Sequence, residues 1–173
     1  MAHEDGDVLY QGKYFAIVAD AIHGEYVRGG DEVLVVPLDD AGNVILTSEP
    51  SAAFGEPTVI LPGGSTDPGV PFAESANAEL QEEAGYRAGR LDFLGEVRPF
   101  SKYLSVGTYV YLARDLVASR LAGDEQYQIG IERVPFAEFE TLIASGRLLD
   151  ARVIAALYRA RTFLKAEAMT TQS

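Results

Sequence analysis

The chain contains no cysteine, and only two of its 173 residues are histidine. The absence of cysteine excludes disulfides, zinc knuckles and thiol nucleophiles. The histidines, His3 and His23, lie far apart in the sequence, so we expect no histidine metal site. A metal site in this chain would therefore be built from neither thiolates nor imidazoles.

Basic residues are scarce as well, because 14 lysines and arginines stand against 26 aspartates and glutamates. The formal net charge of -12 disfavours a broad surface for nucleic acid or for an anionic membrane. No apolar stretch approaches the ~20 residues that span a bilayer. The first residues, MAHEDGD, lack the cationic segment and apolar run of a secretory signal. We therefore expect a cytoplasmic protein without nucleic-acid or membrane partners, which meets any phosphate-bearing partner through a few cations or a metal.

What is present is an ordinary globular composition, with 47% hydrophobic and 23% charged residues. A chain of this length can bury a substantial core within one domain. The sequence shows no repeat, low-complexity linker or internal boundary, so we expect a single domain over residues 1–173. The final residues, MTTQS, are predicted to form a frayed tail.

Apolar patterns predict strands first, then one helix, then further strands and finally helices. The predicted strands cover residues 13–22, 31–39, 44–47, 58–62, 90–100 and 106–116. Residues 23–30 are typical of a turn, and DDAGN at 39–43 separates two apolar runs and predicts a hairpin. Residues 117–131 are predicted to be an exposed loop. Helices are predicted at residues 136–145 and 150–167. This order favours a mixed sheet between helices over a regular βαβ alternation.

The middle helix, predicted over residues 71–84, carries three closely spaced glutamates. Pro71 suits its first turn, and Gly85 suits the position just past its end. The glutamates are Glu79, Glu82 and Glu83. At ~100° per residue they fall on the flank of the apolar stripe, within an arc of about 100°. Carboxylates at this spacing can converge on one or two Mg²⁺ or Mn²⁺ ions, although a solvated acidic patch would give the same pattern.

The segment from Gly64 to Tyr86 resembles the Nudix box, G-x5-E-x7-R-E-U-x-E-E-x-G-U, in which U is apolar. The matching positions are Gly64, Glu79, Leu80, Glu82, Glu83, Gly85 and Tyr86. Val70 stands where the family has glutamate, and Ala78 stands where it has arginine. In the family this arginine is credited with orienting a metal-binding glutamate, so its loss could lower activity or shift metal affinity. The resemblance implies the Nudix fold, an α/β (α+β) domain whose mixed central sheet lies between helices, with an N-terminal antiparallel strand pair.

The likeness extends over about residues 8–166, which we take as the core of the domain, with flexible termini. LPGGSTDPG, at 61–69, resembles the LPAG-x-x-DPGE entry of ADP-ribose pyrophosphatases. Residues 115–164 look like the C-terminal part of Nudix hydrolases of ADP compounds. The resemblance implies divalent-metal-dependent hydrolysis of the pyrophosphate bond in a nucleoside diphosphate derivative, with ADP-ribose or a related ADP compound as substrate. It also implies a homodimer that exchanges N-terminal strands.

The same resemblance assigns roles to individual residues. Mg²⁺ or Mn²⁺ would be held by Glu79, Glu82, Glu83 and the carbonyl of Gly63, and would lower the pKa of a bound water. Glu125 is the first candidate for the general base and Asp124 the second, and a box glutamate, Glu82 among them, is the alternative. Beyond the resemblance, the chemistry of the residues makes Arg98, Lys102 and Arg28 candidates for binding phosphate and Phe54 a candidate for stacking on a base, and Gly64 is a further candidate substrate contact.

Two further interpretations remain open at the level of sequence. The altered positions Val70 and Ala78 would suit a regulatory module with the Nudix fold, which binds a nucleotide but hydrolyses it weakly or not at all. A structural domain with a solvated acidic helix is the other alternative. The first would bind nucleotide without forming product, and the second would not be stabilised by Mn²⁺ at all.

Overall fold

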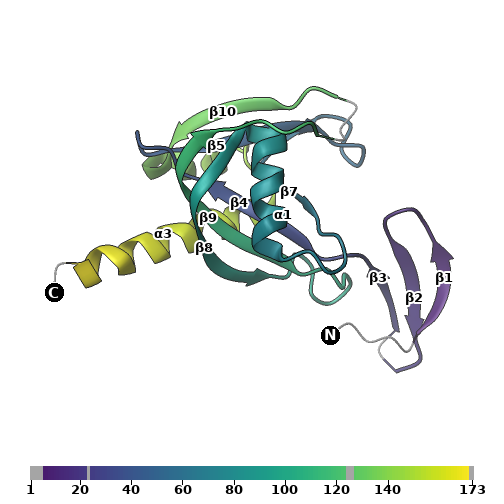
Figure 1. Cartoon of the computed structure of the whole chain (residues 1–173). Coiled ribbons are helices and arrows are strands. Elements are labelled where there is room, and N and C mark those ends of the chain that lie inside the picture. The colour runs from purple at the N-terminus through teal and green to yellow at the C-terminus, as the bar shows by residue number, and fades with distance from the viewer. Residues whose placement is uncertain (1–5, 23, 124–126, 172–173) are drawn as a thin grey trace.

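The computed structural model describes residues 6–22, 24–123 and 127–171, which fold into three sheets and several helices (Figure 1). The strands are β1 (Asp7–Gln11), β2 (Ala16–Asp20), β3 (Gly24–Arg28), β4 (Glu32–Pro37), β5 (Asn43–Pro50), β6 (Pro57–Ile60), β7 (Gly63–Ser65), β8 (Tyr86–Val97), β9 (Thr108–Ala118) and β10 (Gly130–Pro135). The helical elements are α1 (Phe72–Glu79), a π-helical turn η1 (Leu80–Ala84), a 3-10 turn η2 (Phe136–Glu138), α2 (Phe139–Ala144) and α3 (Ala151–Thr171).

The central sheet has the strand order β7-β4-β9-β8, in which β4 runs parallel to β9 and antiparallel to β7. Successive side chains of β4 point to opposite faces, because side chains alternate along a strand. Leu34 packs with Leu157 of α3 in one core cluster, whereas Val35 packs with Leu80 of η1 in the other. The two clusters place helices on both faces of the sheet, which confirms the predicted mixed sheet between helices.

The predicted hairpin at residues 39–43 is wrong as a strand pairing. The tight turn itself is present, since Oδ1 of Asp39 accepts hydrogen bonds from the backbone N–H groups of Ala41 at 3.0 Å and Asn43 at 2.8 Å. After a single bridge between Leu38 and Val44, however, the two strands enter different sheets. β5 instead pairs antiparallel with the next strand, β6, over residues 47–50 and with the distant β10 over residues 43–48, so both of its edges are hydrogen-bonded outside the sheet of β4.

The predicted loop at residues 117–131 is shorter than expected. β9 continues to Ala118, and β10 begins at Gly130 and pairs antiparallel with β5 from Gly130 opposite Ser48 to Pro135 opposite Asn43. The sequence of β10 has no strong apolar alternation, because most of its residues are exposed or half-buried, and the strand was therefore not predicted. The backbone ladder with β5 defines this strand.

The predicted frayed tail is also wrong for its first residues, because α3 continues to Thr171. Glu167 near the end of this helix accepts hydrogen bonds from Arg114 at 2.6 Å and from Arg90 at 2.8 Å, which tie the helix to β8 and β9. The hydrogen bond from Arg114 is the main cause that lowers the pKa of Glu167, and the bond from Arg90 adds to it. Burial would raise this pKa, but the two arginines outweigh it and bring the pKa to about 2.

The N-terminal strands form a separate antiparallel sheet, β1-β2-β3, which projects from the body of the molecule (Figure 1). The expected N-terminal antiparallel pair is present as β1 and β2. The predicted turn at residues 23–30 is wrong over Gly24–Arg28, because these residues form β3 and pair with β2. Val27 of β3 exchanges backbone hydrogen bonds with the loop after β8, donating to Tyr103 at 2.8 Å and accepting from Ser105 at 2.9 Å. No helix in the described ranges has the length and apolar character needed to cross a membrane.

Candidate active site

The helix that carries the three glutamates forms as predicted. The residue before it, Pro71, has extended backbone angles, and the helix ends at Gly85, whose φ of 77° lies in the left-handed region that glycine adopts without strain. Its last turn, Leu80–Ala84, is π-helical, a form that is frequent at functional sites. Leu80 and Ala84 are buried against the central sheet, so the glutamates between and beside them lie at the edge of the core.

These glutamates line an open cavity of about 900 Å³. Its carboxylates are Glu49, Asp67, Glu74, Glu79, Glu82 and Glu83. Among the described residues of its lining, Lys13 is the one lysine or arginine. A cavity with this balance of charge attracts cations and repels phosphates, unless a cation lies between the phosphate and the carboxylates.

Two consecutive glycines set the distance between the box helix and β7. The N–H of Gly63 donates a hydrogen bond of 3.0 Å to Oε2 of Glu83, which is only 3% exposed. The neighbouring Gly64 lies against the side chain of Glu79, because a Cβ at Gly64 would be 2.8 Å from Cδ of Glu79. The glycine pair therefore allows two carboxylates of the helix to reach the backbone of β7.

The donor set of the cavity fits a hard divalent cation. Carboxylates and backbone carbonyls are the ligands that Mg²⁺ and Mn²⁺ take in proteins. The space beside Gly64 that a Cβ would fill is left to the Glu79 carboxylate. In the described part of the chain, no three acidic or histidine side chains converge closely enough to form a complete ligand cluster. The side chains of Glu79, Glu82 and Glu83 would therefore have to turn toward a common ion.

The segment after β9 is joined to the C-terminal end of the box helix. The N–H of Ser119 donates to the carbonyl of Gly85 at 3.0 Å, and its hydroxyl donates to Oε1 of Gln81 at 2.9 Å. Arg120 donates to the carbonyl of Glu82 at 3.3 Å. The bonds to Gly85 and Glu82 satisfy backbone carbonyls that a helix end leaves without intrahelical partners. They also fix the start of the loop that leads toward residues 124–126.

The structure brings together some of the predicted site residues but not all of them. Gly63, Gly64 and the three box glutamates share the acidic cavity. The two candidate bases, Asp124 and Glu125, lie outside the described residues.

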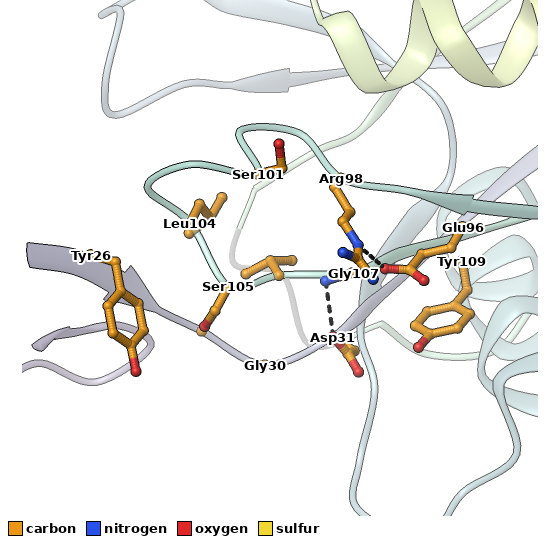
Figure 2. A pocket seen from close by; sticks show the side chains of 12 residues that line it. Tyr26, Gly30, Asp31, Glu96, Arg98, Ser101, Leu104, Ser105, Gly107 and Tyr109 are labelled. Atoms are coloured by element: carbon orange, nitrogen blue, oxygen red, sulfur yellow. Dashed lines mark hydrogen bonds and ion pairs between the residues drawn. The ribbon is translucent and has the colours of Figure 1, made fainter. Parts of the chain in front are cut away.

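Arg98 lines a second cavity of about 600 Å³, between the linker after β3 and the loop after β8 (Figure 2). Its guanidinium forms an ion pair of 2.7 Å with Glu96, which raises the pKa of Arg98. In the same cavity, Asp31 accepts a hydrogen bond of 2.9 Å from the N–H of Gly107, and burial raises the pKa of Tyr109. Arg98 therefore faces different surroundings from the box glutamates.

The other predicted substrate contacts are dispersed. Lys102 borders another small cavity beside the N-terminal sheet, with its ammonium 5.1 Å from the ring centroid of Tyr103. Phe54 is 82% exposed, on the loop between β5 and β6. Of the residues with described positions, neither Phe54 nor Arg28 belongs to the lining of the acidic cavity.

The sequence analysis missed several residues of the acidic cavity, among them Glu49 and Tyr127. Glu49 lies at the end of β5, and the hydroxyl of Tyr127 donates a hydrogen bond of 2.8 Å to its Oε2. Strand alternation could have indicated Glu49, because it lies four residues after Ile45, whose side chain packs in the cluster beneath the box helix. Tyr127 follows a loop and carries no comparable signal.

The two positions at which the box departs from the family pattern, Val70 and Ala78, also line the acidic cavity. The glutamate and arginine of the family pattern would both stand in the wall of this cavity. Relative to that pattern, the cavity therefore lacks one negative and one positive charge. In their place, Glu83 receives the backbone N–H of Gly63. This bond orients one glutamate without an arginine.

Comparisons with known proteins agree with this geometry. The NUDIX domain model matches residues 30–157. ADP compounds hydrolase NudE of Escherichia coli (strain K12) is 31% identical over 137 residues, which cover 79% of this chain and 73% of that protein. The crystal structure of an ADP compounds hydrolase matches with a TM-score of 0.81 and 26% identity, over 95% of this chain and 94% of that chain. The chain therefore has the Nudix fold and belongs to the Nudix family, as a Nudix pyrophosphohydrolase.

Proposed function

We propose that the chain hydrolyses the pyrophosphate bond of a nucleoside diphosphate linked to a second moiety, with a divalent metal ion as cofactor and ADP-ribose or a related ADP compound as substrate. The observation that carries the proposal is the acidic cavity in which Glu79, Glu82 and Glu83 lie beside the Gly63–Gly64 backbone. The choice of an ADP compound is supported by the two relatives, each of which is named an ADP compounds hydrolase.

The proposed cofactor is Mg²⁺ or Mn²⁺, held by the box glutamates and the carbonyl of Gly63. Such an ion, when bound, neutralises phosphate charge and lowers the pKa of water. Among the proposed ligands, Glu83 is buried and accepts the N–H of Gly63. Glu125 remains our first candidate for the residue that takes the proton of the attacking water, with Asp124 second and Glu82 as the alternative within the box.

We also propose a homodimer and a cytoplasmic location. The small N-terminal sheet exposes apolar side chains that an association of two copies would cover. They include Val8, Leu9, Tyr10 and Ile17. Light scattering coupled to size-exclusion chromatography tests the dimer, and a monomer at all micromolar concentrations would contradict it.

The decisive experiment is a substrate panel with Mg²⁺ or Mn²⁺, read out by product identity. ADP-ribose is expected to give AMP and ribose 5-phosphate, and the panel should include NADH, diadenosine polyphosphates and nucleotide sugars. The metal-free protein and the Glu82→Gln variant serve as controls and are expected to form little product. Absence of product from every compound would overturn the proposal. Binding without product would instead favour the nucleotide-binding module that Val70 and Ala78 suggest.

A further inference from the structure

The tip of the β1–β2 hairpin reaches the acidic cavity from outside the central fold. The N–H of Gly12 donates to the carbonyl of Phe15 at 2.8 Å, which closes a tight turn with Lys13 and Tyr14 at its tip. In Figure 1 this turn is the end of the small sheet nearer to α1 and β7. Both tip residues are exposed, and both line the cavity that contains the box glutamates.

The position of this tip is defined by contacts behind it. Phe15 packs close to Gly29, since a Cβ at Gly29 would lie 2.9 Å from the Phe15 ring and 2.8 Å from a methyl group of Val106. The hydrogen bonds of Val27 with the loop after β8 hold the same sheet. The sheet that carries Lys13 is therefore held in place by its contacts with Gly29 and with the loop after β8.

The ammonium group of Lys13 is also restrained by its neighbour. Nζ lies 4.7 Å from the ring centroid of Tyr14, within the range of a cation–π interaction. Such a contact reduces the number of orientations that a long lysine side chain samples. The positive charge at the tip is thereby kept beside the acidic cavity.

The negative charge of the cavity suggests why a lysine lies at its edge. Six carboxylates line the site, and all but Glu49 and Asp67 come from the box helix. Metal ions at the box would neutralise the phosphate oxygens that face the helix, whereas oxygens turned toward the hairpin would remain without a cation. Arg98, which the sequence suggested for this purpose, faces the other cavity.

We propose that Lys13 is a substrate-binding residue that contacts the diphosphate group from the side opposite the box helix; this inference rests on the proposed function. Its role is to improve binding of the diphosphate, and it takes no part in proton transfer. A lysine suits this position as a compact point charge with three donors on a flexible stem.

The test compares Lys13→Met, Lys13→Arg and the matched control Lys165→Met, which removes the same charge from an exposed position on α3. With ADP-ribose and Mn²⁺, Lys13→Met is expected to raise KM roughly tenfold and to change kcat less than about twofold. Lys13→Arg should keep KM within about threefold of the unmodified protein. The increase in KM should shrink at high ionic strength, because salt screens an exposed charge.

An unchanged KM in Lys13→Met, or an equal rise in Lys165→Met, would overturn the inference. An unmodified protein without turnover would count against the proposed function, and calorimetric binding of ADP with Mn²⁺ then tests Lys13 separately. A Kd for ADP that is roughly tenfold weaker in Lys13→Met would support its role. An equal Kd in the two proteins would overturn it.

Discussion

The backbone N–H of Gly63 donates a hydrogen bond of 3.0 Å to the carboxylate of Glu83, 20 residues further along the chain. This bond joins the short strand β7 to the last turn of the box helix, and both of its residues line the acidic cavity. Hydrogen bonds to a charged group are stronger than neutral ones. The geometry of the glutamates therefore depends on the backbone of the preceding loop.

Substitution of Glu83→Gln should remove activity and leave the fold intact. Glutamine keeps an oxygen that can accept the Gly63 N–H, but it lacks the charge that a divalent ion needs. We expect kcat/KM to fall roughly 10²–10⁴-fold, a range typical of a lost catalytic group. Steady-state kinetics and circular dichroism check this.

A matched control is Glu56→Gln, on the exposed loop between β5 and β6. It should behave like the unmodified protein in both assays. The thermal stabilisation caused by Mn²⁺ should also disappear in Glu83→Gln alone, because that stabilisation reports binding to the folded state. Full activity of Glu83→Gln would exclude this residue from the metal site.

The two glycines before the helix should respond differently to alanine. A Cβ at Gly63 would lie 3.1 Å from Cα of Leu34, against the backbone of β4, so Gly63→Ala should lower the free energy of unfolding by about 1–3 kcal/mol. A Cβ at Gly64 would meet the movable carboxylate of Glu79 instead.

Gly64→Ala should therefore displace Glu79 and raise the Mn²⁺ concentration needed for half-maximal activity, while stability changes little. Urea denaturation and metal titration of both variants separate the two effects. Equal destabilisation of the two variants would show that Glu79 does not move aside.

The link between the segment after β9 and the box helix can be measured as a coupling energy. Ser119 and Gln81 share a side-chain hydrogen bond of 2.9 Å. In a double-mutant cycle, Ser119→Ala and Gln81→Ala should show a coupling of about 0.5–1.5 kcal/mol in the free energy of unfolding. Additive effects of the two substitutions would show that the bond contributes nothing.

A glutamate at position 70 should strengthen metal binding. Val70 lines the acidic cavity, so Val70→Glu would add a carboxylate where the family pattern has one. We expect the half-saturating Mn²⁺ concentration to fall severalfold, since two opposite unit charges about 4 Å apart attract by about 1 kcal/mol in water. Val117→Glu, at an exposed position of β9, is the control and should leave the titration unchanged.

The end of α3 should be stabilised in a pH-dependent way by Glu167. Its pKa is lowered from an ordinary value of 4.5 to about 2, chiefly by the hydrogen bond from Arg114. Because the lowered pKa favours the ionised folded state, the stabilisation is present above pH 4.5 and is lost as the pH falls toward 2.

Thermal denaturation from pH 7 to pH 2 should therefore show a lower Tm for Glu167→Gln at pH 7 and convergence of the two proteins at acidic pH. Glu138→Gln, a substitution outside this network, should run parallel to the unmodified protein throughout. A constant difference between Glu167→Gln and the unmodified protein down to pH 2 would contradict the lowered pKa.

The box helix could be predicted from sequence because its signals are local. Pro71 before its first turn, Gly85 after its last and the apolar stripe between them act within a few residues of one another. The proximity of Gly63 and Gly64 to the glutamates came from the family pattern. The hydrogen bond that joins Gly63 to Glu83 is visible only in the structure.

Strand pairing was less predictable. The turn at residues 39–43 formed as expected, yet β4 and β5 entered different sheets, because β4 pairs with β7 and β9 whereas β5 pairs with β6 and the distant β10. β10 was missed because its side chains are mostly exposed, and its pairing with β5 lies in the backbone. A turn motif constrains the direction of the chain but does not select among distant strands.

The sequence by itself therefore determined the order of strands and helices and the carboxylates of the box helix, since these depend on periodicity and spacing, and its resemblance to the Nudix box indicated the family. Tertiary structure decided which other side chains meet those carboxylates. It placed Lys13, Glu49 and Tyr127 at the acidic cavity and Arg98 at the other one. The physical reason is that convergence in space arises from the packing of sheets and loops, and no local property of the chain encodes which distant residue will face a given cavity.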